Sequence, residues 1–114
     1  MAETSRSPAR AGSEPPGRFR ATVHGTCFAD REQHLEGLRA GDELILIPGP
    51  PTDDDPGIWV HLRSGDTVGH LPPEIEQWMV PWMHRGGRAT ATAVRVGDAE
   101  TPSWRRLIIE VVCA

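Results

Sequence analysis

The sequence predicts one mainly β domain with two helices, arranged as a small barrel of six strands. Its 114 residues are typical of a single domain. Short stretches of alternating apolar and polar residues recur along the chain, and Gly- and Pro-rich turns separate them. Closing such short strands into a barrel removes exposed strand edges, which favours a barrel over an open sheet.

The six strands are predicted from alternation and from their content of β-branched and aromatic residues. In the first, Phe19, Ala21 and Val23 share one face. In the last, Leu107 and Ile109 are followed by Val111 on the same face, and in the fifth the small side chains of the alternating alanines permit close packing. The predicted strands are 19–25, 42–47, 58–62, 67–71, 88–96 and 104–112.

Two further stretches predict helices. Asp30 and Gln33 have the spacing of a capping box, so a short helix begins there and ends by Gly41. A second helix begins at Pro72, and Pro81 inside it should kink or restart it. Its apolar stripe, which we expect to be core, contains Ile75, Trp78, Met79, Trp82 and Met83.

Residues 1–17 differ in composition from the rest of the chain. They hold Ser, Pro, Gly, Ala and Arg without apolar periodicity, which predicts a disordered tail before a domain at 18–114. Neither a secretory leader nor a membrane span is predicted, because no long apolar run occurs. With its cysteines far apart, at Cys27 and Cys113, the protein is expected to be cytoplasmic with reduced thiols.

Charge and motifs narrow the classes of function. The formal net charge of −4 argues against broad electrostatic binding of nucleic acid, so any such contact should be local. No phosphate-binding Gly loop, catalytic triad or paired catalytic carboxylates stand out, which predicts a protein that is no enzyme and needs no cofactor. No metal is expected either. His24 and Cys27 form only half of a zinc pattern, and the three aspartates at 53–55 lack the spaced oxygen ligands of a calcium-binding loop.

A set of short motifs follows one another in order between Val23 and Val112. The most specific is Val68-Gly69-His70-Leu71-Pro72, shortly after Gly65. The others are Val23-x-Gly25, Leu38-x-x-Gly41-Asp42-x-Leu44-x-Leu46, Ile58-x-Val60 and Gly87. This pattern resembles the HIRAN family.

The resemblance implies a modified OB-like barrel with six strands and two helices. HIRAN domains occur alone in bacteria and fused to DNA-remodelling translocases in eukaryotes, where they bind the free 3′ end of single-stranded DNA. The resemblance therefore implies a role in DNA repair or replication-fork processing, with single-stranded DNA or a 3′ end as the partner.

Three candidate DNA-binding residues follow from the resemblance. Phe28 matches an aromatic that stacks on a base, Asp54 an acidic residue that contacts the terminal 3′-hydroxyl, and His70 a position near backbone phosphate. The alternative roles are structural: a turn cap for Asp54 and a strand end satisfied by backbone for His70. A fourth candidate, Trp59, comes from the alternation, which turns its ring away from Ile58 and Val60 to the outer face.

The chain departs from the HIRAN pattern at three positions. It has Cys27 where an Arg is expected, Ala29 in place of a second aromatic, and Pro73 in place of a Lys. These changes keep a second hypothesis open, in which the domain has lost DNA binding and recognises a protein or another ligand.

Overall fold

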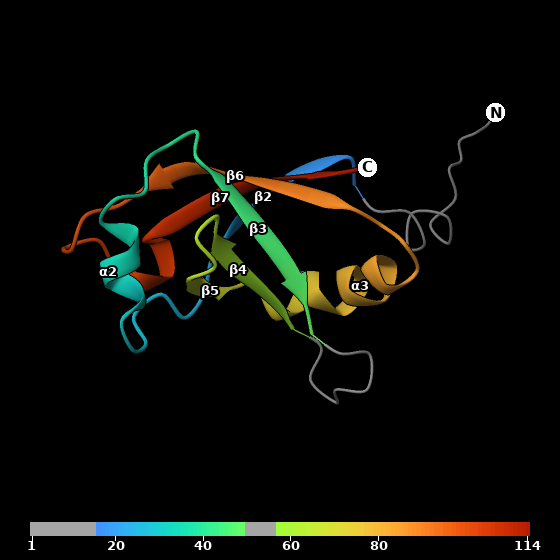
Figure 1. Ribbon diagram of the computed structural model, residues 1–114, viewed down its shortest axis with the longest axis horizontal. Coiled ribbons are helices and arrows are strands. Elements are labelled where there is room, and N and C mark those ends of the chain that lie inside the picture. The colour runs from blue at the N-terminus through green and yellow to red at the C-terminus, as the bar shows by residue number, and fades with distance from the viewer. Residues whose placement is uncertain (1–15, 50–56) are drawn as a thin grey trace.

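The computed structural model describes residues 16–49 and 57–114 (Figure 1). Asp54 and most of the predicted tail lie outside these residues. The mainly β fold is confirmed, and no helix in the described ranges is long and apolar enough to span a membrane. In chain order the elements are β2 (Arg18–Thr22), α2 (Arg31–Leu35), β3 (Glu43–Pro48), β4 (Ile58–Leu62), β5 (Thr67–His70), α3 (Pro73–His84), β6 (Ala89–Val96), the 3-10 turn η1 (Ser103–Arg105) and β7 (Leu107–Cys113).

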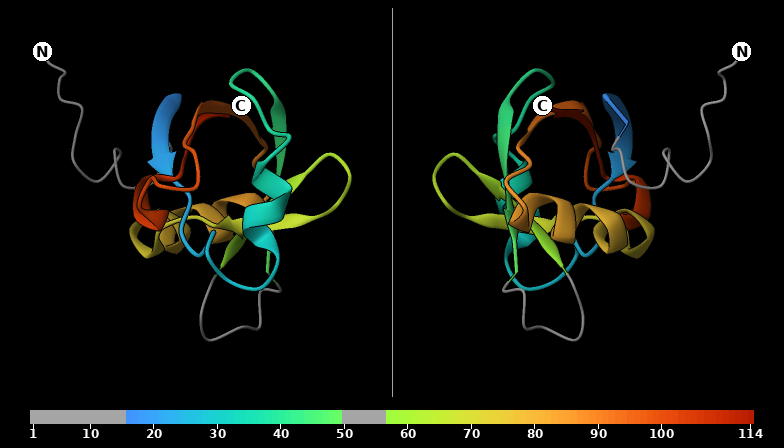
Figure 2. Two further views of the ribbon diagram at one scale, coloured as in Figure 1. Left: turned by 90° about the vertical axis from the view of Figure 1, so that its left-hand side faces the viewer. Right: turned by 90° about the vertical axis from the view of Figure 1, so that its right-hand side faces the viewer.

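The strands form one antiparallel sheet of six strands in the order β2-β7-β6-β3-β4-β5. Figure 2 shows the sheet curling into an arch, with α3 lying across its open side. This is the OB-like barrel that the sequence predicted. Consecutive strands do not all pair with each other. Strand β2 pairs with β7, so the first and last strands of the described sheet are neighbours, whereas β3 pairs with β4 and β6.

The two edge strands of the sheet meet at a single bridge between His24 and His70, which closes the barrel. The His24 amide donates to the His70 carbonyl at 2.8 Å, and the His70 amide donates back at 3.0 Å. Gly69 permits this approach, because a Cβ there would collide with the His24 carbonyl oxygen and with Val23. We call this place, where the chain after β2 meets the end of β5, the seam.

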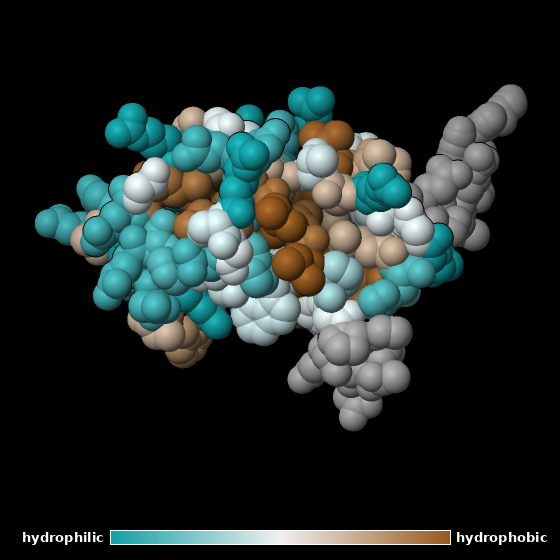
Figure 3. Space-filling model, viewed as in Figure 1, coloured by the Kyte–Doolittle hydropathy of each residue, from teal (hydrophilic) through white to brown (hydrophobic). Residues whose placement is uncertain are grey.

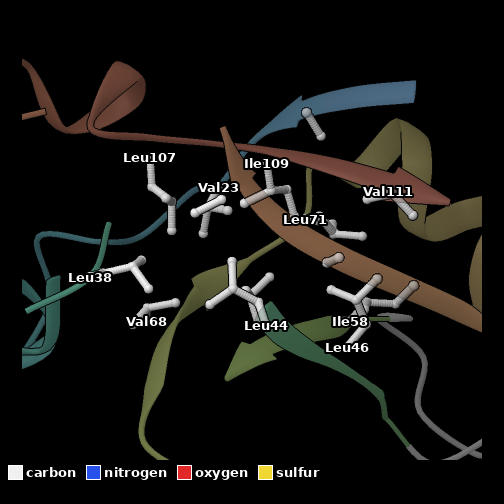
Figure 4. Close-up of a cluster of buried hydrophobic side chains, with 14 of the residues drawn as sticks. Val23, Leu38, Leu44, Leu46, Ile58, Val68, Leu71, Leu107, Ile109 and Val111 are labelled. Carbon is white, nitrogen blue, oxygen red and sulfur yellow. The ribbon is translucent and has the colours of Figure 1, made fainter. Parts of the chain in front are cut away.

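The core fills the inside of the curl (Figure 4). The predicted inward face of β7 is confirmed, since Leu107, Ile109 and Val111 are fully buried. Ala91 and Ala93 of β6 are also buried, as their small size led us to expect. Each large aliphatic side chain so buried contributes about 1.5–3 kcal/mol, which holds the curled sheet together. The other fully buried apolar residues are Val23, Ile58, Val60, Val68, Leu71 and Met79.

The predicted capping box is wrong. The Asp30 side chain makes no capping hydrogen bond; its backbone carbonyl accepts from the Gln33 amide instead, at 3.1 Å. The carboxylate lies 3.8 Å from the His34 imidazole, which competes for it. Helix α2 spans a single turn and ends at Leu35, so the prediction of a short helix that ends by Gly41 is confirmed.

Of the kink or restart predicted at Pro81, the restart does not occur: helix α3 continues through Pro81 as one element. Pro81 and Gln77, four residues earlier, are both exposed, so water can satisfy the carbonyl that proline leaves without a donor. Trp78 and Trp82 are half-buried rather than fully buried: they pack at the edge of the core, with Trp78 edge-on to Phe19 at 5.8 Å between ring centroids. The last strand also begins later than predicted, because Ser103–Arg105 forms η1.

Candidate functional site

A row of cross-strand neighbours runs over the outside of the barrel to the seam. Ile47 of β3 is paired with Trp59 of β4, Trp59 with His70 of β5, and His70 with His24. Trp59 is 39% exposed, while Ile58 and Val60 on either side are fully buried. The predicted outward orientation of Trp59 is therefore confirmed.

The rings in this row contact one another edge to face. The centroids of Trp59 and His70 are 5.7 Å apart at an interplanar angle of 71°. His70 and His24 are 5.9 Å apart at 79°. Edge-to-face packing is a favoured aromatic geometry, so each ring fixes the orientation of the next.

The loop after the seam places Phe28 beside this row. Its backbone turns back at once, since the Phe28 amide donates to the Gly25 carbonyl at 3.4 Å and the Arg31 amide to the Phe28 carbonyl at 3.1 Å. Ala29 has φ of +53°, a left-handed conformation that completes the turn. Phe28 projects outward from this turn and is 62% exposed, as a stacking residue requires.

Arg31, which the sequence reasoning missed, connects Phe28 to Trp59. Its guanidinium carbon lies 5.9 Å from the centroid of the Phe28 ring and 5.4 Å from that of Trp59. Nη1 donates a hydrogen bond of 2.8 Å to the Gly25 carbonyl. Both ring distances are within the range of cation–π attraction, so the guanidinium joins residues from two separate parts of the chain.

His70 has one nitrogen bonded to backbone and the other turned to the site. Nδ1 lies 2.9 Å from the Leu71 carbonyl, which only accepts, so Nδ1 carries the proton. The edge of the ring that holds Cδ2 and Nε2 faces Gly25: a Cβ placed on this glycine would lie 3.3 Å from Cδ2, 3.5 Å from Nε2 and 3.1 Å from Arg31 Nη1. The predicted structural role of His70, a strand end satisfied by backbone, is thus present, and the side chains of His70 and Arg31 both pack against a residue without a side chain.

Glu76 of α3 supports this arrangement from inside and was also missed. It is only 6% exposed, although it is an acid. Its Oε2 accepts from the Ile58 amide at 2.8 Å and lies 3.5 Å from His70 Nδ1. The sequence did contain a signal for Glu76. It lies three residues before the buried Met79, and this spacing places its carboxylate on the inner face of the amphipathic helix.

Helix α3 also fixes both ends of segment 50–56, which contains Asp54. At one end, His84 Nε2 lies 2.8 Å from the Gly49 carbonyl, and the Gly49 amide donates to the Gly57 carbonyl at 2.8 Å. At the other end, Glu76 holds the Ile58 amide. The residues that follow this segment lead directly into Trp59, so the chain that flanks the segment adjoins the row.

The structure therefore brings together Phe28, Trp59 and His70, the three predicted site residues that it describes. In the same ranges, no cluster of three or more His, Cys, Asp or Glu side chains could hold a metal ion. Cys27 is exposed, and Cys113 is half-buried at the end of β7, where burial raises the pKa of its thiol.

No protein-family model matches the sequence, and no curated protein matches it. Two solved structures are similar to it. A protein from Lactobacillus plantarum has a TM-score of 0.62 and 20% identity, over 85% of this chain and 95% of that one. The HIRAN domain of human HLTF has a TM-score of 0.56 and 17% identity, over 85% of this chain and 73% of that one. The chain thus has a HIRAN-like fold, as the resemblance in sequence implied.

Proposed function

We propose that this domain is a non-catalytic module that binds single-stranded DNA at a free 3′ end. The observation that carries the proposal is the pair of exposed rings, Phe28 and Trp59, beside the His70 ring on a HIRAN-like fold. The rings stack on bases, His70 contacts backbone phosphate, and Asp54 accepts a hydrogen bond from the terminal 3′-hydroxyl. Such a module would act in DNA repair or at replication forks in the cytoplasm.

The affinity should be modest. One stacked base contributes about 1–3 kcal/mol, and a hydrogen bond to a charged group about 1.5–3 kcal/mol. Against this, the net charge of −4 opposes non-specific attraction to DNA. The missing Arg, Lys and second aromatic lower the affinity further, so we expect dissociation constants in the high-micromolar range at physiological salt.

Fluorescence polarisation with three labelled DNAs tests the proposal. We expect a short single strand with a free 3′-hydroxyl to bind more tightly than the same strand with a blocked 3′ end, and duplex to bind least. The variant Asp54→Ala should remove the preference for the free end. Equal affinity for free and blocked ends would exclude a 3′-end site.

A second set of variants tests where the strand binds. Phe28→Ala and Trp59→Ala should each weaken binding by roughly tenfold or more, since each removes one stacking surface. Trp104→Ala is the matched control, because Trp104 is 63% exposed and has the Arg105 guanidinium 5.3 Å from its centroid, yet is not part of the row. An equal loss for Trp104→Ala would contradict a site centred on Phe28 and Trp59.

The alternative, a module for protein recognition, is favoured by one observation. Ile45 and Ile47 are 44% and 43% exposed on the outer face of β3, where Figure 3 shows apolar surface. Adjacent exposed apolar residues are typical of protein contact sites. Absence of any single-strand binding at low salt would favour this function over the first.

A further inference from the structure

Arg31 is in an unusual position for an arginine side chain. Its guanidinium lies over two aromatic rings, 5.9 Å from the Phe28 centroid and 5.4 Å from that of Trp59. The residue is only half-buried, so solvent reaches the group. A planar guanidinium between two rings has a fixed orientation, and therefore a fixed direction for each N–H donor.

The charge of Arg31 is not neutralised by a partner in the described part of the chain. No carboxylate there lies within 4.0 Å of it, whereas Arg106 pairs with Glu32 and Arg18 with Glu110. The neighbouring acid, Asp30, is directed to His34. One donor is used by the Gly25 carbonyl, and a guanidinium has five, so donors remain for an anion.

The other side chain at Gly25 is the imidazole of His70. The position of a Cβ on Gly25 would lie 3.1 Å from Arg31 Nη1, 3.3 Å from His70 Cδ2 and 3.5 Å from His70 Nε2, so both side chains pack against this glycine from different elements, α2 and β5. The packing holds the Arg31 guanidinium in place beside the two rings. Its remaining N–H donors therefore carry the case for an anion.

We infer that Arg31 is the residue that binds the phosphate of the nucleotide whose base stacks on Phe28 or Trp59. The inference rests on the proposed function and names its main charge contact. It also explains how a chain with Cys27 before the aromatic can still present a guanidinium at that ring: Arg31 supplies it from the first residue of α2.

The salt dependence of binding separates a phosphate contact from a structural role. We would measure polarisation of a short thymidine strand with a free 3′-hydroxyl over a series of salt concentrations. Arg31→Gln should weaken binding by about tenfold to a hundredfold at low salt and reduce the slope of log K against log salt by about 0.7. Arg31→Lys should keep the slope, since it keeps the charge, but lose part of the affinity.

Arg85→Gln is the matched control. Arg85 is exposed and follows α3, which lies across the molecule from α2 (Figure 1). Its loss should change neither affinity nor slope by more than about twofold. Melting curves of each variant show whether the fold is retained.

The outcomes distinguish the two proposals. If the unmodified protein binds no single strand at low salt, the proposed function fails, and this inference with it. If it binds but Arg31→Gln leaves the slope unchanged, Arg31 only fixes the loop and the inference alone fails. Should Arg31→Gln not fold, the Arg31 Nε–H resonance of the unmodified protein must shift on addition of the strand, and an unshifted resonance overturns the assignment.

Discussion

The barrel is joined very differently at the seam and between β6 and β7. Seven residue pairs connect β6 to β7, from Ala89 with Cys113 to Val96 with Leu107. At the seam, His24 and His70 form one bridge. Between β6 and β7, the long ladder keeps both strands within the sheet. At the seam, the chain leaves the sheet after one bridge, and its next residues place side chains over the outer face of the sheet. The candidate site lies where pairing is least extensive.

The largest expected effect comes from a methyl group at the seam. Gly69→Ala should destabilise the domain by about 2–5 kcal/mol, because the new Cβ collides with the His24 carbonyl and the left-handed backbone strains alanine. Gly65→Ala is the control: it also has positive φ, but nothing lies within 4 Å of its Cβ position. Urea denaturation measures both, and equal losses would show that the seam is not tightly closed.

The next effect concerns the support of the seam from α3. Glu76→Ala should cost about 1–3 kcal/mol, since it leaves the Ile58 amide buried without its acceptor. Glu76→Gln keeps an oxygen for that amide and should cost less. The free energy of unfolding of both variants checks this. A larger loss for Glu76→Gln than for Glu76→Ala would mean that the hydrogen bond to the Ile58 amide is not what stabilises the fold here.

Hydrogen exchange compares the two junctions directly in the unmodified protein. The amides of His24 and His70, bonded only across the bridge, should exchange at least about tenfold faster than amides paired between β6 and β7, because one bridge opens more readily than a ladder. Exchange followed by NMR measures both sets. Equal protection would indicate that the barrel opens as one unit.

The smallest effect distinguishes the two thiols, one on each side of the comparison. Cys27, exposed after the seam, should react with iodoacetamide before Cys113 at the end of β7. Burial raises the pKa of Cys113, so less of the reactive thiolate is present there near neutral pH, and its labelling should increase as the pH rises. Mass spectrometry over time gives the order, with Cys27→Ser as the control, and faster labelling of Cys113 would contradict it.

The elements of the fold were largely predictable because the periodicity that defines a strand is local. Alternation alone identified the buried faces of β2 and β7 and the outward ring of Trp59. Side-chain partners were not predictable in the same way. Asp30 has the spacing of a helix cap but is directed to His34, a competition that spacing does not reveal.

The site residues show the same limit. Phe28, Trp59 and His70 were named from motif and alternation, but Arg31 acquires its role only when β4 brings Trp59 over it. Glu76 bonds an amide 18 residues earlier in the chain. Contacts between distant segments depend on how the strands are arranged, and no local pattern contains that information.

Fixing both ends of segment 50–56 on α3 has an evolutionary consequence. His84 and Glu76 hold the backbone at Gly49 and Ile58, so the contacts that anchor the chain here are made by residues outside the segment. Insertions, deletions and changes of charge in this segment should be tolerated by the scaffold. Selection can then alter this segment, which contains the proposed ligand contact Asp54, independently of the residues that maintain the fold.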